Sequence, residues 1–314
     1  MHQLNASLGL VAAASILVLA SASANAQAPR TWVSGVGDDA NPCSRSAPCK
    51  TFQGAISRTV TDGEISVLDP GGYGTVTITK SITINGTNGA GYGSILASLA
   101  TGVNIAITDP TDVRRTVRLI ALDINGTGNG INGVRIFGSN LAGTSVVVEN
   151  SRIDGFTGRG ISDERANGGK LVVSDTTVRH TQDSGIRIAA GGVNRIDATL
   201  TNVRVHNSAA AGLTVNGGAK ATVGNSVFSG STFGLDIEQA GTEANVDNST
   251  VSGNTTGIFT NNGAVLRLSG STVSFNGTGV TGTVSSFSNN RFISNGAGGT
   301  ITAIGTTSNP TGLQ

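Results

Sequence analysis

The chain has 314 residues, with 20 Lys and Arg, 19 Asp and Glu and a formal net charge of +1. This balance argues against a nucleic-acid-binding protein that depends on many phosphate contacts, and the low charge content argues against a disordered polyampholyte. With 46 Gly, one Trp and mostly small side chains, the sequence lacks the large apolar residues of a helical bundle core. It favours short strands joined by tight turns.

The first segment has the features of a cleaved export signal. An apolar run, Leu8 to Ala20, is followed by small residues up to Ala26. The run is too short for a comfortable transmembrane helix, and the small residues suit a signal peptidase. We therefore predict a signal peptide over residues 1–26 and export to the periplasm, the extracellular space or the cell surface. The absence of Lys and Arg before the run fits less well and leaves an uncleaved anchor as the alternative.

The next segment, residues 27–63, is predicted to form an N-terminal cap. Its two cysteines, Cys43 and Cys49, lie in a polar loop, and in an exported chain such a pair indicates one local disulfide. A metal site, the alternative, needs more thiolate or imidazole ligands than the mature chain offers. Residues 51–60 have the apolar spacing of a short helix, which we expect to cover the first turn of the following domain.

From residue 64 to residue 314 the sequence repeats itself. A Gly followed by an aliphatic residue recurs at intervals of 22 to 27 residues, from Gly133–Val134 to Gly279–Val280. Each unit alternates apolar and polar residues with period two, which indicates strands rather than helices. A fixed period of this length predicts a solenoid, here a single-stranded parallel β-helix of about ten rungs.

Columns of polar side chains follow the same register. One column is an asparagine ladder at a turn, followed by a column of mostly hydroxyl residues, and Asn suits left-handed turn geometry. A further column alternates in charge, and stacked opposite charges stabilise neighbouring strands by about 0.2–1 kcal/mol each. The asparagine ladder comprises Asn150, Asn202, Asn225, Asn248 and Asn289, with breaks at Asp175 and Gly270, and the charge ladder comprises Lys170, Asp197, Lys220 and Glu243.

Several segments resemble a known superfamily. The segment from Thr31 to Ile56, the short Gly71–Tyr73 stretch and the repeat unit Val146–Ile153 are similar to secreted right-handed parallel β-helix proteins of the pectin-lyase-like superfamily. The resemblance covers nearly all of the mature chain and implies a right-handed, all-β fold and export. The superfamily contains polysaccharide lyases, glycoside hydrolases, epimerases, phage tailspikes and surface adhesins, so the fold does not specify an activity.

Motifs of two enzyme families are missing. Segments 157–160, 183–185 and 210–212 align with the polygalacturonase motifs but retain only Asp183, whereas that chemistry needs paired carboxylates. The Arg-x-Pro-x-x-Arg motif of pectate lyases is excluded because no Pro lies between Pro110 and Pro310. We interpret Asp163 and Glu164, beside Arg165, as a solvated loop rather than a cation site. We predict no metal and no cofactor, and calcium enters only under a lyase alternative.

The resemblance also points to one surface. In the superfamily, the strand after each Gly lines the sugar groove, and several polar or aromatic residues here occupy that strand or its start. Arginines can grip uronate carboxylates with two parallel hydrogen bonds, and aromatic faces can stack on sugars. An ordinary solenoid surface is the alternative. The candidate catalytic residues are Arg159, Asp183 and Arg187, and the candidate groove residues are Arg135, Asp236, Phe233 and Phe259.

The sequence therefore predicts an exported β-helix protein that presents a sheet face to extracellular or envelope polysaccharide. A lyase or epimerase with a divergent site around Arg159, Asp183 and Arg187 is one alternative, and a structural or adhesive surface protein is another. The expected partner is a polysaccharide or cell-envelope glycan, with no nucleic acid and no membrane span after signal cleavage. The pattern specifies neither the sugar nor the oligomeric state.

Overall fold

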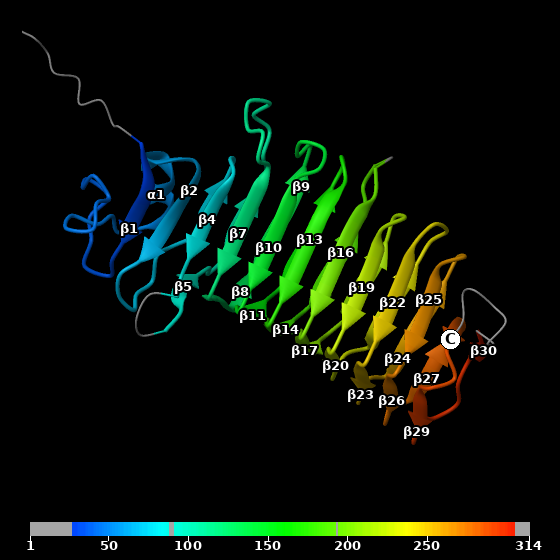
Figure 1. Cartoon of the computed structure of the whole chain (residues 1–314). Helices are drawn as coiled ribbons and strands as arrows, with labels where there is room; N and C mark the ends of the chain where they lie inside the picture. Colours follow the sequence, from blue (N-terminus) through cyan, green and yellow to red (C-terminus); the bar gives the residue numbers. More distant parts are fainter. Residues whose placement is uncertain (1–26, 88–90, 193, 305–314) are drawn as a thin grey trace, which may run out of the picture.

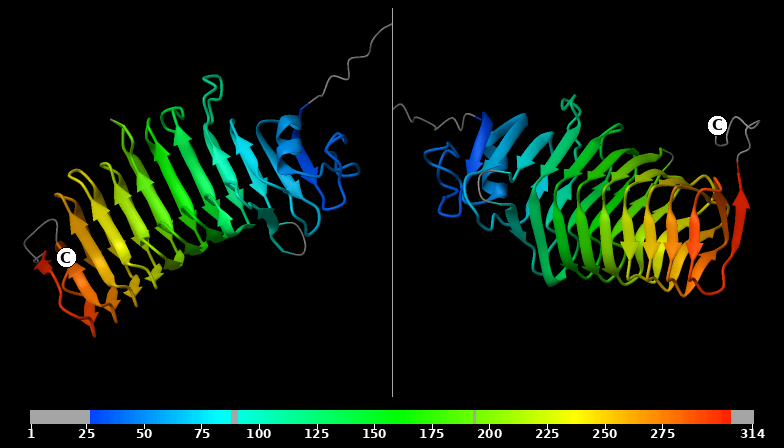
Figure 2. Two further views of the ribbon diagram at one scale, coloured as in Figure 1. Left: turned by 180° about the vertical axis from the view of Figure 1, so that it is seen from behind. Right: turned by 60° about the horizontal axis from the view of Figure 1, so that its bottom comes forward.

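The structure, a computed structural model, describes residues 27–87, 91–192 and 194–304. The predicted signal peptide, residues 1–26, lies outside these residues. Across the described ranges, no helix has both the length and the apolar character that a membrane span requires. The chain winds into a parallel β-solenoid whose strands stack along one axis, with β1 at one end and β30 at the other (Figures 1 and 2).

Three parallel sheets, here named A, B and C, form the walls of the solenoid. Sheet A comprises β1 (Ala28–Val33), β2 (Thr59–Val67), β4 (Ile82–Asn85), β7 (Thr116–Ile120), β10 (Ser145–Glu149), β13 (Gly169–Ser174), β16 (Ile196–Thr201), β19 (Lys220–Gly224), β22 (Glu243–Asp247), β25 (Val265–Ser269), β28 (Thr283–Ser286) and β30 (Thr300–Ala303). Sheet B comprises β5 (Gly93–Leu96), β8 (Leu122–Gly130), β11 (Arg152–Phe156), β14 (Thr177–Thr181), β17 (Arg204–Ser208), β20 (Val227–Ser229), β23 (Thr250–Ser252), β26 (Thr272–Ser274) and β29 (Arg291–Ile293). Sheet C comprises β3 (Val76–Ile78), β6 (Val103–Ile105), β9 (Val134–Gly138), β12 (Ile161–Arg165), β15 (Ile186–Ala189), β18 (Ala211–Asn216), β21 (Phe233–Glu238), β24 (Thr256–Asn261) and β27 (Thr278–Thr281).

The predicted all-β parallel solenoid is confirmed, but it has about eight turns instead of the expected ten or so. The estimate of ten assumed equal turns from residue 64 onward. Early turns use more residues, because ten residues, 106–115, connect β6 to β7. Each regular turn runs through sheets A, B and C in that order, and each strand pairs in parallel with its equivalent in the next turn.

The corner between sheets A and B is built by left-handed residues. The first corner residue has a φ between 46° and 56° at Asn150, Asp175, Asn202, Asn225, Asn248 and Gly270, a conformation that Asn, Asp and Gly tolerate best. Asn289 differs, since the positive φ of the last corner is at Ser288 (φ 64°). Asn289 instead accepts a hydrogen bond from the backbone N–H of Gly270 at 2.9 Å.

The second corner residue is a buried hydroxyl in most turns. The Ser249 hydroxyl accepts the backbone N–H of Ser226 at 3.1 Å, and the Ser271 hydroxyl accepts that of Ser249 at 3.0 Å. Each hydroxyl also donates to the carbonyl two residues earlier. The column therefore satisfies backbone groups that burial would otherwise leave unpaired.

A second internal column, at the corner between sheets B and C, was not anticipated from the sequence. The backbone N–H of Asn254 donates to Oδ1 of Asn276 at 3.0 Å, and that of Asn276 donates to Oδ1 of Asn295 at 3.1 Å. The amide of Asn254 also bonds that of Asn276 at 3.0 Å. These internal asparagines form a ladder of their own beside the corner column, in which Asn202 Nδ2 donates to Asp175 Oδ1 at 2.5 Å.

The charge ladder has the expected register, but its ion pairs are not continuous. Lys170, Asp197, Lys220 and Glu243 lie opposite one another on β13, β16, β19 and β22. Lys220 pairs with Glu243, which also binds Arg267 at 2.7 Å. Asp197 turns instead to Arg195, at 2.7 Å. These side chains are partly exposed, so each pair contributes about 1 kcal/mol at most.

The N-terminal region contains the predicted disulfide and helix. Cys43 and Cys49 are joined, and α1 (Phe52–Arg58) begins where the Thr51 hydroxyl accepts the Gly54 N–H at 2.9 Å. The Phe52 ring packs against Tyr73 with 5.1 Å between centroids. The same region also contributes β1 to sheet A, where it pairs with β2. The edge of the first full turn is thus covered by a strand as well as by a helix (Figure 2).

One turn places charges inside the core. Asp163 on β12 lies in register with Ile136 on β9 and with Ile188 on β15. Both Asp163 and Arg165 are fully buried. Arg165 Nε donates to Asp163 Oδ1 at 2.8 Å, and its Nη1 and Nη2 also reach the carbonyl oxygens of Thr144 and Lys170. The solvated-loop interpretation is therefore wrong, because β12 continues through this segment and its alternation points both residues inward.

Candidate functional site

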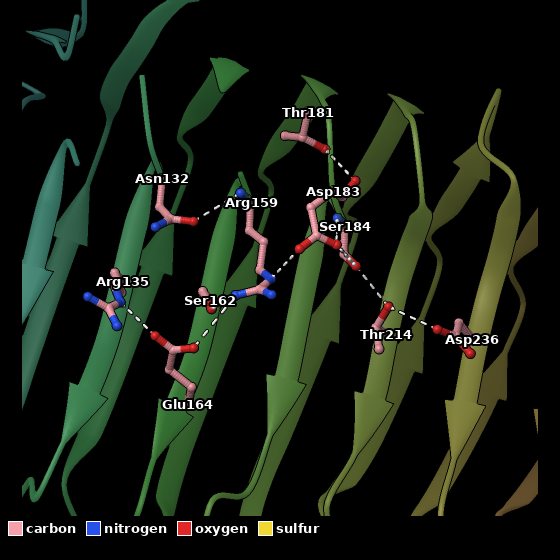
Figure 3. Close-up of polar contacts among 10 residues, drawn as sticks. All are labelled: Asn132, Arg135, Arg159, Ser162, Glu164, Thr181, Asp183, Ser184, Thr214 and Asp236. Atoms are coloured by element: carbon pink, nitrogen blue, oxygen red, sulfur yellow. Dashed lines mark hydrogen bonds and ion pairs between the residues drawn. The ribbon is translucent and has the colours of Figure 1, made fainter. Parts of the chain in front are cut away.

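The outer face of sheet C carries the residues that the sequence singled out. Its strands place one residue per turn in a continuous column at about 4.8 Å spacing. The column contains Arg135, Ser162, Arg187, Thr214, Asp236 and Phe259. Side chains from the preceding corners, Arg159 and Asp183, reach over this face (Figure 3).

Charges in the first part of this face neutralise one another. Arg135 Nε donates to Glu164 Oε1 at 2.6 Å, and Arg159 Nη1 lies 3.6 Å from Glu164 Oε2. Arg159 Nε lies 2.8 Å from Asp183 Oδ2, although the angle is too poor for a hydrogen bond. The four side chains therefore form one ion-pair network (Figure 3).

A chain of hydroxyl groups extends this network along the face. Asp183 Oδ1 accepts the Ser184 hydroxyl at 3.1 Å, and the hydroxyls of Ser184 and Thr214 are 2.9 Å apart. The Thr214 hydroxyl then donates to Asp236 Oδ2 at 3.4 Å. Polar contacts thus run along the face from Arg135 on β9 to Asp236 on β21 (Figure 3).

Arg187 stands apart from the network. It is half-buried on β15 between Ser162 and Thr214. Within the described ranges, its guanidinium forms no ion pair. Its positive charge nevertheless acts to lower the pKa of Asp236 without direct contact. The structure therefore joins two of the three predicted catalytic candidates, Arg159 and Asp183, and leaves Arg187 on the same face without an ion pair to any described residue.

Asp236 has an altered acidity. Burial, followed by repulsion from Glu238, raises the pKa of its carboxyl to about 6, while the Thr214 hydrogen bond and Arg187 act in the opposite direction. Its Oδ1 is buried and has no hydrogen-bond partner among the described residues. A carboxyl with this pKa is able to exchange a proton near neutral pH.

Two aromatic rings border Asp236. Phe233 begins β21 and Phe259 lies on β24 in register with Asp236. Their rings are 5.1 Å apart between centroids, tilted by 45°, and both residues are partly exposed. The pair offers an apolar surface beside the Asp236 carboxyl. Phe233 lies two strands and Phe259 three strands away from Arg187.

Glu164, which was expected in a solvated loop, belongs to this site and joins Arg135 to Arg159. A signal was present, because in the strand after Gly160 the alternation of side chains places Ser162 and Glu164 on the same, outward side. In the described part of the chain, no three His, Cys, Asp or Glu side chains gather where they could hold a metal ion.

Comparisons with known proteins agree with this fold. A family model described as "Right handed beta helix region" matches residues 193–311. The crystal structure of pectate lyase Pel9A superposes with a TM-score of 0.64 at 14% identity, covering 90% of this chain and 80% of the lyase. A rhamnogalacturonan lyase gives 0.56 at 13% identity, covering 80% and 75%.

A third similar structure is the enzymatically active domain of tailspike protein 2 from bacteriophage CBA120, with a TM-score of 0.57 at 14% identity over 81% of this chain and 43% of the tailspike chain. No curated protein sequence matches. Identities this low establish the fold and not the activity. The chain is a right-handed parallel β-helix protein with a pectate-lyase-like fold.

Proposed function

We propose that the outer face of sheet C binds an extended acidic polysaccharide outside the cytoplasm. The observation that carries this proposal is the position of Arg187, a half-buried arginine without a carboxylate partner among the described residues. Arginine binds carboxylates through two parallel N–H donors, a geometry that suits a uronate. Arg135 and Arg159, in contrast, already pair with Glu164.

The remaining groups of the face extend this interaction along a chain. A polysaccharide that crosses the strands meets a new side chain about every 4.8 Å. From Arg187 it passes Thr214 and Asp236 and reaches Phe259. The Phe233–Phe259 pair supplies a surface for stacking on a sugar ring. The names of two structural neighbours, pectate lyase and rhamnogalacturonan lyase, support a polysaccharide as the ligand.

Export is part of the proposal. The Cys43–Cys49 disulfide is typical of an oxidising compartment, and the sequence begins with a predicted signal peptide. The glycan would therefore be met in the periplasm, outside the cell or at its surface.

A second candidate function is cleavage or epimerisation of the same polysaccharide. It is favoured by the pKa of Asp236, about 6, which suits a group that accepts or donates a proton on the sugar-binding face. Arg159 and Asp183 remain candidate residues for this activity, but their ion pair must open before either can contact a sugar.

The test is a binding screen of the chain from Gln27 onward against polygalacturonate, alginate and neutral glucans, with and without calcium. Arg187→Gln is expected to weaken binding of the acidic polymer at least tenfold, about 1.4 kcal/mol. Arg204→Gln, which alters an exposed arginine on sheet B, is the matched control and is expected to bind normally.

The same screen separates the alternatives. Formation of unsaturated uronate, detected by ultraviolet absorbance and lost in Asp236→Asn, would establish a lyase, and a changed uronate composition would establish an epimerase. Equal binding by the wild type and Arg187→Gln would refute the proposed site. Failure of every acidic polymer to bind would overturn the proposal in favour of a structural or adhesive role.

A further inference from the structure

A groove lies on the outer face of sheet A, far along the chain from the N-terminal cap. It has a volume of about 560 Å³ and is lined by Thr222, Asn245, Val246, Asp247, Arg267, Ser269 and Phe287. The strands that form its floor, β19, β22 and β25, face the viewer in Figure 1. Ligand sites in proteins commonly have volumes of about 300–1,000 Å³, so the groove can accommodate a sugar unit.

The floor of the groove consists of two columns of outward-facing residues. One column is formed by Thr222, Asn245 and Arg267. In the other column, Gly224 precedes Asp247, and a Cβ placed on Gly224 would meet no atom within 4 Å. The missing side chain therefore leaves the Asp247 carboxylate open on one side.

An aromatic residue forms a wall of this groove. Phe287 follows β28, and its backbone N–H donates to the carbonyl of Leu268 at 3.0 Å. This bond holds the segment against β25 and places Phe287 beside Arg267 and Ser269 at the groove. An aromatic residue next to several hydrogen-bonding groups is a common composition of carbohydrate sites, because one sugar face is apolar and its edges carry hydroxyls.

Most charges around the groove are compensated within the protein. Arg267 Nη1 lies 2.7 Å from Glu243 Oε2 and 3.4 Å from Asn245 Oδ1. Hydrogen bonds from Lys220 and Arg267 lower the pKa of Glu243 to about 2, so this carboxylate stays ionised and paired. Asp247 differs, because its exposed carboxylate forms no ion pair or side-chain hydrogen bond with the residues that the structure describes.

We propose that this groove binds a neutral hexopyranose unit of a glycan, with one sugar face against Phe287 and sugar hydroxyls donating to the Asp247 carboxylate. The free carboxylate selects against uronates by charge repulsion, whereas Arg187 on sheet C selects for them. The two sites lie on different sheets, so this inference does not depend on the proposed function of sheet C.

Isothermal titration of the chain from Gln27 onward with cellohexaose, maltohexaose and mannohexaose tests the proposal. We expect at least one of these neutral hexaoses to bind, and we expect Phe287→Ala and Asp247→Asn each to weaken that binding at least tenfold. Phe275→Ala is the matched control, because Phe275 is an aromatic residue of the same region that is 70% exposed and lies outside the groove. It is expected to leave the affinity unchanged.

Two further comparisons make the result specific. Arg187→Gln is expected to leave hexaose binding unchanged, and Phe287→Ala is expected to leave binding of acidic polymer unchanged, so failure of one site is distinguishable from failure of the other. Asp247→Asn changes an exposed side chain with little change in shape and serves if Phe287→Ala does not fold. The proposal is overturned if none of the three hexaoses binds, or if Asp247→Asn binds them as tightly as the wild type.

Discussion

The inside and the outside of the β12 turn hold charge in different ways. Inside, Asp163 and Arg165 are fully buried, and Arg165 donates both to Asp163 and to two backbone carbonyls. Outside, Glu164 is partly exposed and is shared between Arg135 and Arg159. A buried charge must have its partners supplied by the fold, whereas the outer face can leave a charge such as Arg187 without a partner. Unpaired charge on the outside is therefore the better guide to ligand binding.

The largest effect is expected from breaking the inner pair. Arg165→Met would leave the Asp163 carboxylate buried without its cation and should lower the free energy of unfolding by about 3–5 kcal/mol. Denaturant unfolding measures this loss. The double variant Asp163→Leu/Arg165→Met should recover most of it, because apolar residues then replace both charges. If the double variant is no more stable than the single one, the loss does not come from an unpaired carboxylate.

A smaller effect, dependent on pH, is expected at Asp236. Its pKa is about 6 in the folded chain but about 4 in an unfolded one, so the folded protein binds more protons between these values and loses stability as the pH rises through them. Asp236→Asn does not ionise and should be more stable than the wild type by on the order of 1 kcal/mol at pH 7.5, a modest gain because the side chain is partly exposed.

Thermal unfolding of both proteins between pH 3 and pH 7.5 provides the measurement. The stability difference attributable to this ionisation should disappear toward the acid end, where Asp236 is protonated in both states. A difference that stays constant with pH would indicate lost packing instead of ionisation.

The smallest effect is expected on the outer face of sheet A. Lys220→Glu removes one of the two cationic partners of Glu243, since Arg267 remains, and places a third acidic residue between Glu243 and Asp197 in the stack. Because these side chains are partly exposed, the free energy of unfolding should fall by about 1 kcal/mol or less, and the decrease should be smaller in high salt. Chemical denaturation of the wild type and the variant at two salt concentrations measures both the size of this decrease and its salt dependence. A loss as large as that of Arg165→Met would contradict the distinction between the two surfaces.

The parallel solenoid, α1 and the disulfide were predictable because each depends on local or repeating sequence. The repeat aligns equivalent residues, so the register of Lys170 with Asp197 and of Arg187 with Ser162 followed from spacing alone. Asp163 and Arg165 were wrongly assigned to a loop, because a run of polar residues at the end of a strand has the same composition as a loop. The groove at Phe287 was missed because that residue follows β28 at the end of the repeats, where register no longer predicts neighbours.

The corners between sheets A and B and those between sheets C and A differ in a way that matters for engineering. From β10 to β26, two residues always connect sheet A to sheet B, whereas three to six residues connect sheet C to sheet A between β9 and β25. The latter connections form a row along the upper edge in Figure 1. Exposed connections of variable length accept added sequence most readily. The row therefore offers regularly spaced positions for displaying foreign peptides, and the asparagine corners should be left intact.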